Sequence, residues 1–334
     1  MPRPAFTLPD VTCPFPSTFA DRPHPQSEEV EREVLELLRD SGMPDTLRGT
    51  LAGIRLGEFT GRLHPAASRP GLRLIMLNNA LSCLHEDWIA EQDEGGRLRS
   101  AAAMTAAYRR ALAVFDGSRP GPHDLPLARA TGLVAQALHD LGRPQHTRRY
   151  RTTLREYWHA HLWEVDLQRQ HAIPSLAEYR QLRPHVLGIR ALSELLPLAG
   201  GTPVPAHLLD HPVVQALARL IVNHHVLVND LFSLAKELHG ERPVNIVLVL
   251  CAEQGLTLQE GVDATARAIE GELAAYLRLR AALPRLGLQH PALLRHLTDL
   301  ERLAADAIAW HAAAPRYRVP PAAPCVAPSG GAER

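Results

Sequence analysis

Three oxygen-bearing side chains recur at every fourth position late in the chain. Asn229, Ser233 and Glu237 stand in the stretch VNDLFSLAKELHG, which is otherwise mostly apolar. Residues four apart on an α-helix are offset by only about 40° around its axis, so the three side chains would form one stripe. An amide oxygen, a hydroxyl and a carboxylate are a hard ligand set that suits Mg²⁺, and Lys236 beside them would suit a phosphate. The competing interpretation is that Ser and Asn bond back to the preceding helical turn or face solvent.

The segments that would position this stripe are helices. Ala, Leu, Arg and Glu dominate the sequence, and alternating β-branched runs are nearly absent, which favours helix by both propensity and period. Gly and Pro occupy the short connections, as expected for antiparallel neighbours in a bundle. The fold class is therefore predicted to be all-α. Helical patterns run from Ser27 to a stop at Gly42, and then over about 70–94, 97–116, 124–141, 145–172, 175–199, 208–239, 242–254, 257–282 and 290–313.

Charge and cysteine usage narrow the range of partners. The 36 basic and 36 acidic residues cancel, which gives no support for nucleic acid or an anionic membrane as a partner. The four cysteines (Cys13, Cys83, Cys251 and Cys325) have no CxxC spacing, which argues against a structural zinc site and a disulfide framework. Neither a signal peptide nor an apolar run of membrane-spanning length is recognisable. We therefore expect a cytoplasmic protein without stable membrane insertion, whose partner is a small molecule.

Several spaced motifs resemble those of the bacterial class I terpene synthases. NDLFSLAKE is similar to the (N/D)DxxSxxxE metal-binding motif of that family, and HLWEVDLQRQHAIPSLAEYRQLRPHVLGIR is similar to an upstream run that ends in a diphosphate-sensing arginine. Here that arginine is Arg183, which precedes Asn229 by 46 residues, as in the family. AWHAAAPRYRV carries the late Arg-Tyr pair, and LPDVTCPFPSTF resembles the N-terminal strap. The resemblance spans residues 7 to 318.

This resemblance implies a single-domain α-helical bundle around a central apolar cavity. The expected boundaries are a proline-rich N-terminal strap over residues 1–26, the helical domain over 27–318 and a disordered tail over 319–334. It also implies a reaction in which three Mg²⁺ ions neutralise an allylic prenyl diphosphate, whose departure leaves a carbocation that cyclises. The simplest substrate is farnesyl diphosphate, giving a sesquiterpene hydrocarbon or alcohol. Family members often form dimers, so a homodimer is an option that no feature of the sequence demands.

Family roles can be carried onto the matching positions. The implied metal ligands are Asn229, Ser233 and Glu237, the implied diphosphate contacts are Arg183, Lys236, Arg316 and Tyr317, and the implied helix-break and cavity residues are Val186, Leu187 and Trp310. Arginine's planar fork matches diphosphate oxygens, although an exposed helix charge is the alternative for Arg183. Gly188 directly after Leu187 favours the implied break in the helix.

The second metal motif of the family departs from its usual form. DDxx(x)D/E is expected roughly 90 to 100 residues before Arg183, where the chain reads LNNALSCLHEDWIAEQDEGG. The best fit is Glu86, Asp87 and Glu91, in which glutamate replaces the first aspartate. The extra methylene displaces the carboxylate by about 1.5 Å, and Mg²⁺ tolerates poor geometry badly. His85, just before the motif, could compensate for this change or face solvent, and we expect it to face solvent.

Aromatic side chains, whose faces stabilise carbocations, make up only 5% of the chain. Trp310 matches a cavity position of the family, whereas Trp88, Trp158 and Trp163 are expected in the core. The altered acidic motif and the low aromatic content leave a second hypothesis open. In it, the chain is a non-catalytic or weakly active relative that binds a diphosphate or an apolar ligand. A third possibility is a chain-elongating prenyltransferase, which the NDxxSxxxE stripe disfavours.

Overall fold

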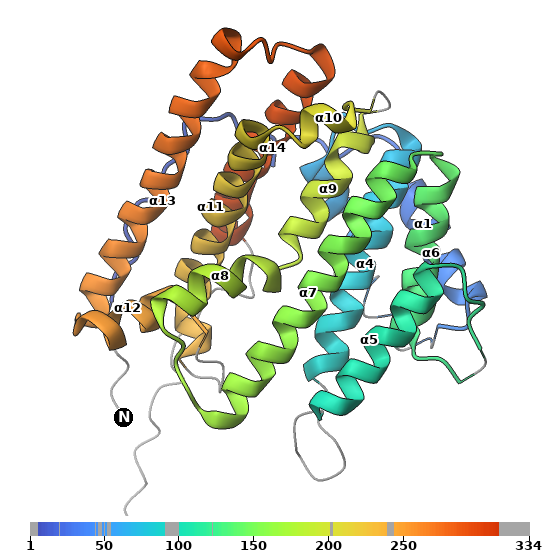
Figure 1. The fold of residues 1–334 in the computed structure, drawn as a ribbon, viewed down its shortest axis with the longest axis horizontal. Helices are drawn as coiled ribbons and strands as arrows, with labels where there is room; N and C mark the ends of the chain where they lie inside the picture. Colours follow the sequence, from blue (N-terminus) through green and yellow to red (C-terminus); the bar gives the residue numbers. More distant parts are fainter. Residues whose placement is uncertain are drawn as a thin grey trace, which may run out of the picture.

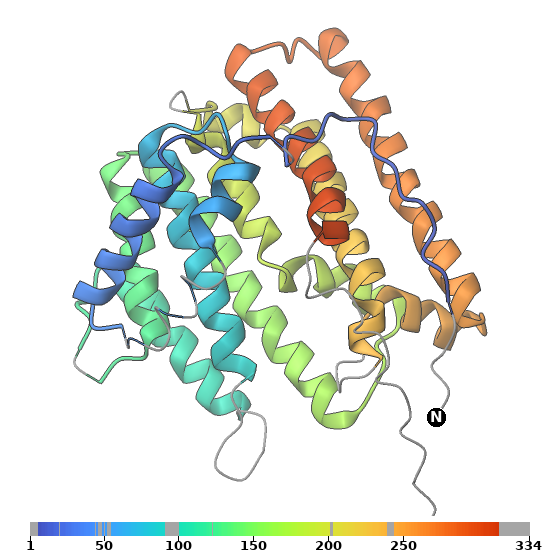
Figure 2. The ribbon, with the colours of Figure 1, turned by 180° about the vertical axis from the view of Figure 1, so that it is seen from behind.

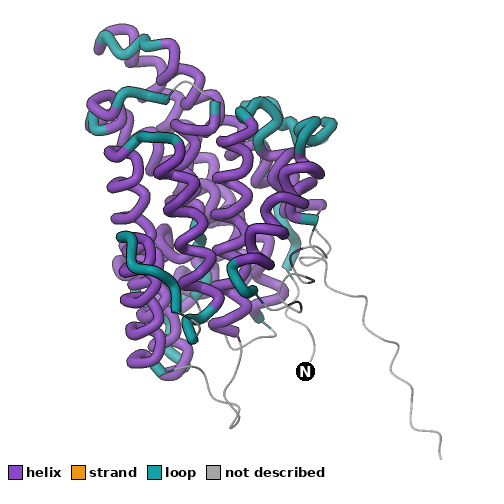
Figure 3. The backbone as a smooth tube through the Cα atoms, turned by 90° about the vertical axis from the view of Figure 1, so that its right-hand side faces the viewer, coloured by secondary structure: helices purple, strands orange, loops and turns teal. Residues whose placement is uncertain are grey.

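The computed structural model describes residues 6–19, 21–43, 45, 49, 51, 55–90, 100–121, 123–200, 203–238 and 244–313. Within these ranges every regular element is a helix, so the all-α prediction is confirmed (Figure 3). None of the helices described there is both long enough and apolar enough to span a bilayer.

The helices follow the predicted segments closely, with three differences. The element α3 has no predicted counterpart, the segment 175–199 is divided into α8 and α9, and the segment 208–239 is divided into α10 and α11. The helices are α1 (Ser27–Asp40), α3 (Leu56–Leu63), α4 (Arg69–Ala90), α5 (Ala101–Phe115), α6 (Pro126–Asp140), α7 (Pro144–Gln170), α8 (Leu176–Val186), α9 (Ile189–Ala199), α10 (Ala206–Leu209), α11 (Pro212–Glu237), α12 (Ile246–Gln254), α13 (Leu258–Ala282), the 3₁₀ turn η1 (Leu283–Leu286) and α14 (Pro291–Ala313).

Two glycines explain why α3 is not visible in the sequence. Gly57 and Gly61 each lower helix propensity by about 1 kcal/mol relative to alanine. Both positions face α1 so closely that a Cβ atom at Gly57 would lie 2.8 Å from the carbonyl oxygen of Ser27, and one at Gly61 would lie 2.7 Å from the Ser27 Cβ atom. Tertiary packing against α1 therefore favours a helix where local propensity does not.

The predicted break after Arg183 is confirmed. α8 begins with a capping box formed by Ser175 and Glu178 and ends at Val186. Gly188 then takes a φ of +65°, in the left-handed region that glycine adopts without steric cost, and α9 starts at the next residue. Leu187 and Gly188 form the connection between α8 and α9.

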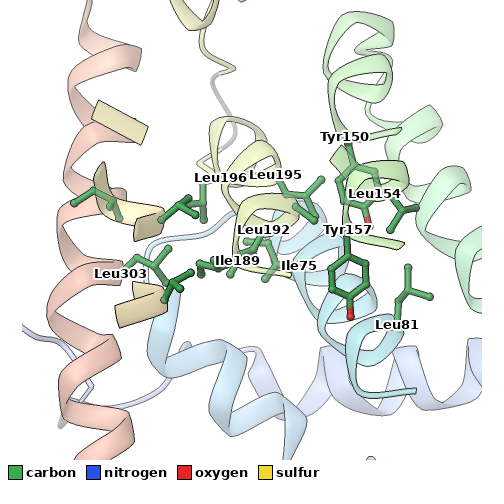
Figure 4. Close-up of a cluster of buried hydrophobic side chains, with 14 of the residues drawn as sticks. Ile75, Leu81, Tyr150, Leu154, Tyr157, Ile189, Leu192, Leu195, Leu196 and Leu303 are labelled. Carbon is green, nitrogen blue, oxygen red and sulfur yellow. The ribbon is translucent and has the colours of Figure 1, made fainter. Parts of the chain in front are cut away.

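The helices pack side by side around one hydrophobic core (Figure 1). α4, α7 and α9 lie in the middle, flanked by α5, α6 and α1 on one side and by α11, α13 and α14 on the other. The close-up in Figure 4 shows how leucines of α9 fill the space between α14 and the pair α4 and α7. The labelled side chains there are Ile75, Leu81, Tyr150, Leu154, Tyr157, Ile189, Leu192, Leu195, Leu196 and Leu303.

The segment before α1 runs without helix along α13 and across α14 (Figure 2). Asp306 of α14 is completely buried and holds this segment, since its Oδ1 atom accepts hydrogen bonds from the Ser17 hydroxyl at 2.6 Å and from the Thr18 amide at 2.8 Å. Phe15 packs edge-on against Tyr276 of α13, with ring centroids 5.6 Å apart. These contacts fasten α14 in place, and α14 contributes one wall of the cavity described next.

Candidate active site

A cavity of about 240 Å³ opens between α3, α4, α7, α8, α9, α11 and α14. It brings together nine of the residues singled out in the sequence: Glu86, Arg183, Val186, Leu187, Asn229, Ser233, Lys236, Glu237 and Trp310. The backbone of Asp87 continues α4, but its side chain lies outside what the structure describes. Glu91, Arg316 and Tyr317 also lie outside the described residues.

The α11 stripe lies on one wall, with all three of its side chains facing the cavity. The Ser233 hydroxyl hydrogen-bonds the carboxyl group of Glu237, and the Asn245 side-chain amide donates to Glu237 Oε2 at 2.8 Å. The same amide donates to the backbone carbonyl of Asp230 at 2.7 Å, which fixes the end of α11 against the start of α12. Burial raises the pKa of Glu237, and the nearby Asp230 carboxylate adds to this.

Arg183 is buried between α7, α8 and α11, and Asp230 is its main partner. Asp230 Oδ1 accepts from Arg183 Nη2 at 2.6 Å and from Nε at 3.1 Å. Weaker contacts of 3.4 Å join the guanidinium to Glu164 Oε1 and to Asn229 Oδ1. Burial by itself would lower the pKa of Arg183, but the carboxylates of Asp230 and Glu164 more than offset this and raise it. The guanidinium therefore remains charged beside the stripe.

Asp230 is one of the site residues that were not singled out in the sequence. It is completely buried, and its second oxygen accepts from the Tyr179 hydroxyl at 2.6 Å and from the Ile246 amide at 2.8 Å. This one carboxylate therefore ties α8, α11 and α12 together at the point where Arg183 meets the stripe. A signal was present, because the family motif has an aspartate at its second position, but the partners of that aspartate come from distant parts of the chain.

Three histidines also line the cavity: His161, His225 and His311. Burial lowers the pKa of His161 and lowers that of His225 well below its ordinary value, so both rings are neutral near pH 7. The Nε2 atom of His311 lies 3.0 Å from Asn229 Nδ2. None of the three was singled out in the sequence, where a lone histidine on an apolar face carries no distinctive signal.

The opposite wall is the end of α4. Glu86 lines the cavity and is exposed, whereas its neighbour His85 is completely buried. The His85 ring contacts the Tyr157 hydroxyl at 2.8 Å through Nδ1 and the Tyr108 hydroxyl at 2.9 Å through Nε2. The prediction that His85 faces solvent is therefore wrong, because α5 and α7 supply two tyrosines that cover it and satisfy both nitrogens.

Aromatic rings occupy the apolar part of the cavity. Trp310 of α14 packs against Phe59 of α3, with ring centroids 5.4 Å apart, and both rings line the cavity. Phe59 was missed in the sequence together with α3. Trp158 is completely buried and stacks on Tyr108, and Trp88 and Trp163 pack against the core, so the expected core positions of these three tryptophans are confirmed.

The cavity is lined by two kinds of side chain. The oxygens of the α11 stripe and the cations of Arg183 and Lys236 give it charged and polar surface, and the side chains of Leu63, Ile189, Leu192 and Leu303 join Phe59 and Trp310 to give it apolar surface. Such a cavity suits a molecule with a polyanionic head and an apolar tail. The head would meet cations and metal ligands, while the tail would be shielded from water.

Comparisons with known proteins agree with this chemistry. Residues 78–275 match the family model described as terpene synthase family 2, C-terminal metal binding. The chain is 28% identical to (+)-T-muurolol synthase, (2E,6E)-farnesyl diphosphate cyclizing, of Roseiflexus castenholzii, over 91% of this chain and 92% of that protein. It is 26% identical to 4-epi-cubebol synthase, (2E,6E)-farnesyl diphosphate cyclizing, of Streptosporangium roseum, over 93% of this chain and 92% of that protein.

A solved structure has the same fold. The crystal structure of the SVS_A2 protein, obtained by ancestral sequence reconstruction, superposes with a TM-score of 0.78 at 25% identity, over 92% of this chain and 90% of that one. The helical bundle is thus shared with a protein of known structure.

Proposed function

Because the chain belongs to terpene synthase family 2, we propose that it is a class I terpene synthase that ionises a prenyl diphosphate and cyclises the resulting carbocation. The observation that carries this proposal is the single cavity in which the α11 stripe and Arg183 face the same space as Trp310 and Phe59. We assign farnesyl diphosphate as substrate and a sesquiterpene hydrocarbon or alcohol as product. The muurolol and epi-cubebol synthases, which cyclise (2E,6E)-farnesyl diphosphate, support this choice.

The donor set of the cavity fits Mg²⁺. Asn229, Ser233 and Glu237 offer only oxygen, and the buried Glu237 carboxyl has a raised pKa that a nearby cation would lower again. These three residues would hold metal on the α11 wall, and Glu86, with Asp87 and Glu91 of the same motif, would hold it on the α4 wall. As in the family, three ions are expected, and when bound they neutralise the charge that develops on the departing diphosphate.

The side chains of the cavity divide the remaining work between them. Arg183 and Lys236 would bind diphosphate oxygens, with Arg316 and Tyr317 as further contacts. As the allylic carbon–oxygen bond breaks, both electrons leave with the diphosphate, and the carbocation remains among apolar side chains. The faces of Trp310 and Phe59 stabilise it by about 0.5–2 kcal/mol each. The cation then cyclises and is quenched either by loss of a proton, which gives a hydrocarbon, or by water, which gives an alcohol.

The size of the cavity bears on chain length. Its volume of about 240 Å³ lies just below the range of small-molecule sites, which begins at about 300 Å³. A compact cavity supports fifteen carbons over twenty. We therefore expect farnesyl diphosphate to be turned over faster than geranylgeranyl diphosphate.

Incubation with defined substrates tests the proposal. Purified protein would be mixed with geranyl, farnesyl or geranylgeranyl diphosphate, with Mg²⁺ or with excess chelator, and the volatile products analysed by gas chromatography and mass spectrometry. We expect cyclic C15 products that depend on Mg²⁺. Absence of turnover with all three substrates, while inorganic diphosphate still raises the melting temperature in Mg²⁺, would instead identify a binding protein without catalysis.

A further inference from the structure

The tautomer of His311 is set by its own helix. His311 is only 2% exposed, and its Nδ1 atom lies 2.6 Å from the backbone carbonyl oxygen of Ala307, one turn earlier on α14. Because a carbonyl oxygen can only accept, Nδ1 carries a proton, and in a ring with a single proton Nδ1 is therefore the protonated nitrogen. Nε2 is then an acceptor, and the atom 3.0 Å from it is Asn229 Nδ2.

This acceptor fixes which way the Asn229 amide points. With the NH₂ group turned to His311, the oxygen Oδ1 lies on the other side, where Arg183 Nη2 approaches to 3.4 Å. A flipped amide would place its NH₂ group against the guanidinium and its oxygen against the imidazole lone pair, and both contacts would be repulsive. The contacts with His311 and with Arg183 therefore favour the same orientation of the Asn229 amide.

The imidazole ring is itself held by its neighbours. Trp310 and His225 pack edge-on at centroid distances of 4.8 and 5.8 Å, and the tilted ring of Phe232 lies at 5.9 Å. Rings on several sides leave His311 little room to rotate away from the Ala307 carbonyl. The orientation of Asn229 is thus transmitted from the backbone of α14 through a rigid ring.

We propose that His311 is a positioning residue, which holds the amide of Asn229 with its oxygen turned towards Arg183 and the proposed metal and diphosphate site. This inference rests on the proposed function, because it assigns to Asn229 Oδ1 the task of a ligand. Groups that orient a metal ligand through a hydrogen bond typically change metal affinity or activity by about 10- to 100-fold when they are removed.

His161 provides a matched comparison within the same cavity. Its Nδ1 atom lies 2.9 Å from the carbonyl oxygen of Tyr157, one turn earlier on α7, so its tautomer is fixed in the same way. Its Nε2 atom, however, lies 4.0 Å from a carboxylate oxygen of Glu164 and not beside an amide. His161 therefore serves as a control, because it makes the same backbone hydrogen bond but does not contact Asn229.

A double-mutant cycle tests the proposal by binding. The dissociation constant of inorganic diphosphate in Mg²⁺ would be measured by isothermal titration calorimetry for His311→Phe and His311→Gln, each with Asn229 and with Asn229→Asp. With Asn229, Phe should weaken binding about tenfold or more, and Gln, whose side-chain oxygen can accept, should restore most of it. With Asn229→Asp the Phe change should have little effect, because a carboxylate has two equivalent oxygens and no wrong orientation.

The control variant His161→Phe should change binding equally in both backgrounds. An equal effect of His311→Phe in both backgrounds would overturn the proposal, since a ring that only fills space does not depend on residue 229. Melting temperatures would be measured for every variant so that loss of folding is not read as loss of binding.

A spectroscopic readout separates this inference from the proposed function. In ¹⁵N-histidine spectra, His311 should show the Nδ1–H tautomer, and its Nε2 resonance should move in Asn229→Leu while that of His161 does not. An Nε2–H tautomer, or no response to Asn229→Leu, would contradict the proposal. If the wild-type protein binds no diphosphate, the proposed function fails, and these spectra still decide whether His311 orients Asn229.

Discussion

The two walls that carry the metal-binding motifs are built differently. On α11, the stripe and its neighbour Asp230 are tied by hydrogen bonds to α8, α12 and α14. On α4, the side chain that is buried and held by hydrogen bonds is His85, whereas the proposed ligand Glu86 is exposed. The α11 wall is therefore preorganised. On the α4 wall the helix is fixed through His85, whereas the carboxylate of Glu86 can change its conformation.

This difference has a physical consequence. Preorganised donors need little rearrangement when charge develops near them, so each one contributes strongly and tolerates little change. An exposed glutamate has more conformations to lose on binding metal, so its contribution is smaller and its position more adaptable.

The largest effect is expected at the centre of the α11 network. Asp230→Asn removes the charge that pairs with buried Arg183, and breaking a buried ion pair costs about 3–5 kcal/mol of unfolding free energy. Urea unfolding would measure this loss. Glu164→Gln is the control, because its contact with the same guanidinium is 3.4 Å long and a weak hydrogen bond is worth about 1 kcal/mol. Equal losses in the two variants would show that Asp230 is not the anchor.

A pair of matched substitutions compares the two walls directly. Glu237→Gln should lower Mg²⁺-dependent turnover about 100-fold, whereas Glu86→Gln should lower it about tenfold, both within the range seen when metal-site groups are removed. Steady-state kinetics over a series of Mg²⁺ concentrations would separate a change in kcat from a change in the metal requirement. A larger loss at position 86 than at 237 would reverse the proposed ranking of the walls.

Substitution of the two aromatic rings that line the cavity is expected to have a smaller effect. Trp310→Leu on α14 should reduce kcat/KM about tenfold and Phe59→Leu on α3 about threefold, because indole has the stronger cation–π interaction and each term is worth about 0.5–2 kcal/mol. The product mixture should also change, since both rings shape the space in which the cation folds. If neither the rate nor the product mixture changes, the rings serve only as packing.

The smallest expected effect is an increase in turnover. Glu86→Asp shortens the side chain to that of the usual family motif, and we expect turnover to rise about two- to fivefold because Mg²⁺ demands near-ideal ligand geometry. The half-saturating Mg²⁺ concentration should fall in parallel. A clear loss of activity would mean instead that the α4 wall depends on the longer side chain, and that its carboxylate is as tightly specified as those of α11.

Much of this organisation can be predicted from the sequence, because helical periodicity and four-residue spacing are local properties. The positions of Asn229, Ser233 and Glu237 on one face follow from helix geometry alone, and the break at Gly188 follows from a single residue. What cannot be predicted depends on partners far along the chain. α3 is helical although its two glycines lower its helix propensity, because it packs closely against α1.

The same reason explains the site residues that the sequence did not reveal. His85 is buried by tyrosines 23 and 72 residues away, and the position of Asp230 becomes meaningful only when Tyr179 and Ile246 meet it. The hydrogen bond of His311 to the Ala307 carbonyl is local, but its neighbour Asn229 is 82 residues away in the sequence. Spacing identifies candidate ligands, whereas the groups that hold those ligands in place are set by tertiary structure.

A crystal structure with Mg²⁺ and inorganic diphosphate tests the central claim most directly. The account predicts diphosphate between the two walls, in contact with Arg183, with metal on the oxygens of Asn229, Ser233 and Glu237 and on the α4 carboxylates. The α11 side chains should keep their present orientations, while Glu86 should move. Diphosphate bound elsewhere, or metal held without the oxygens of α11, would contradict the account.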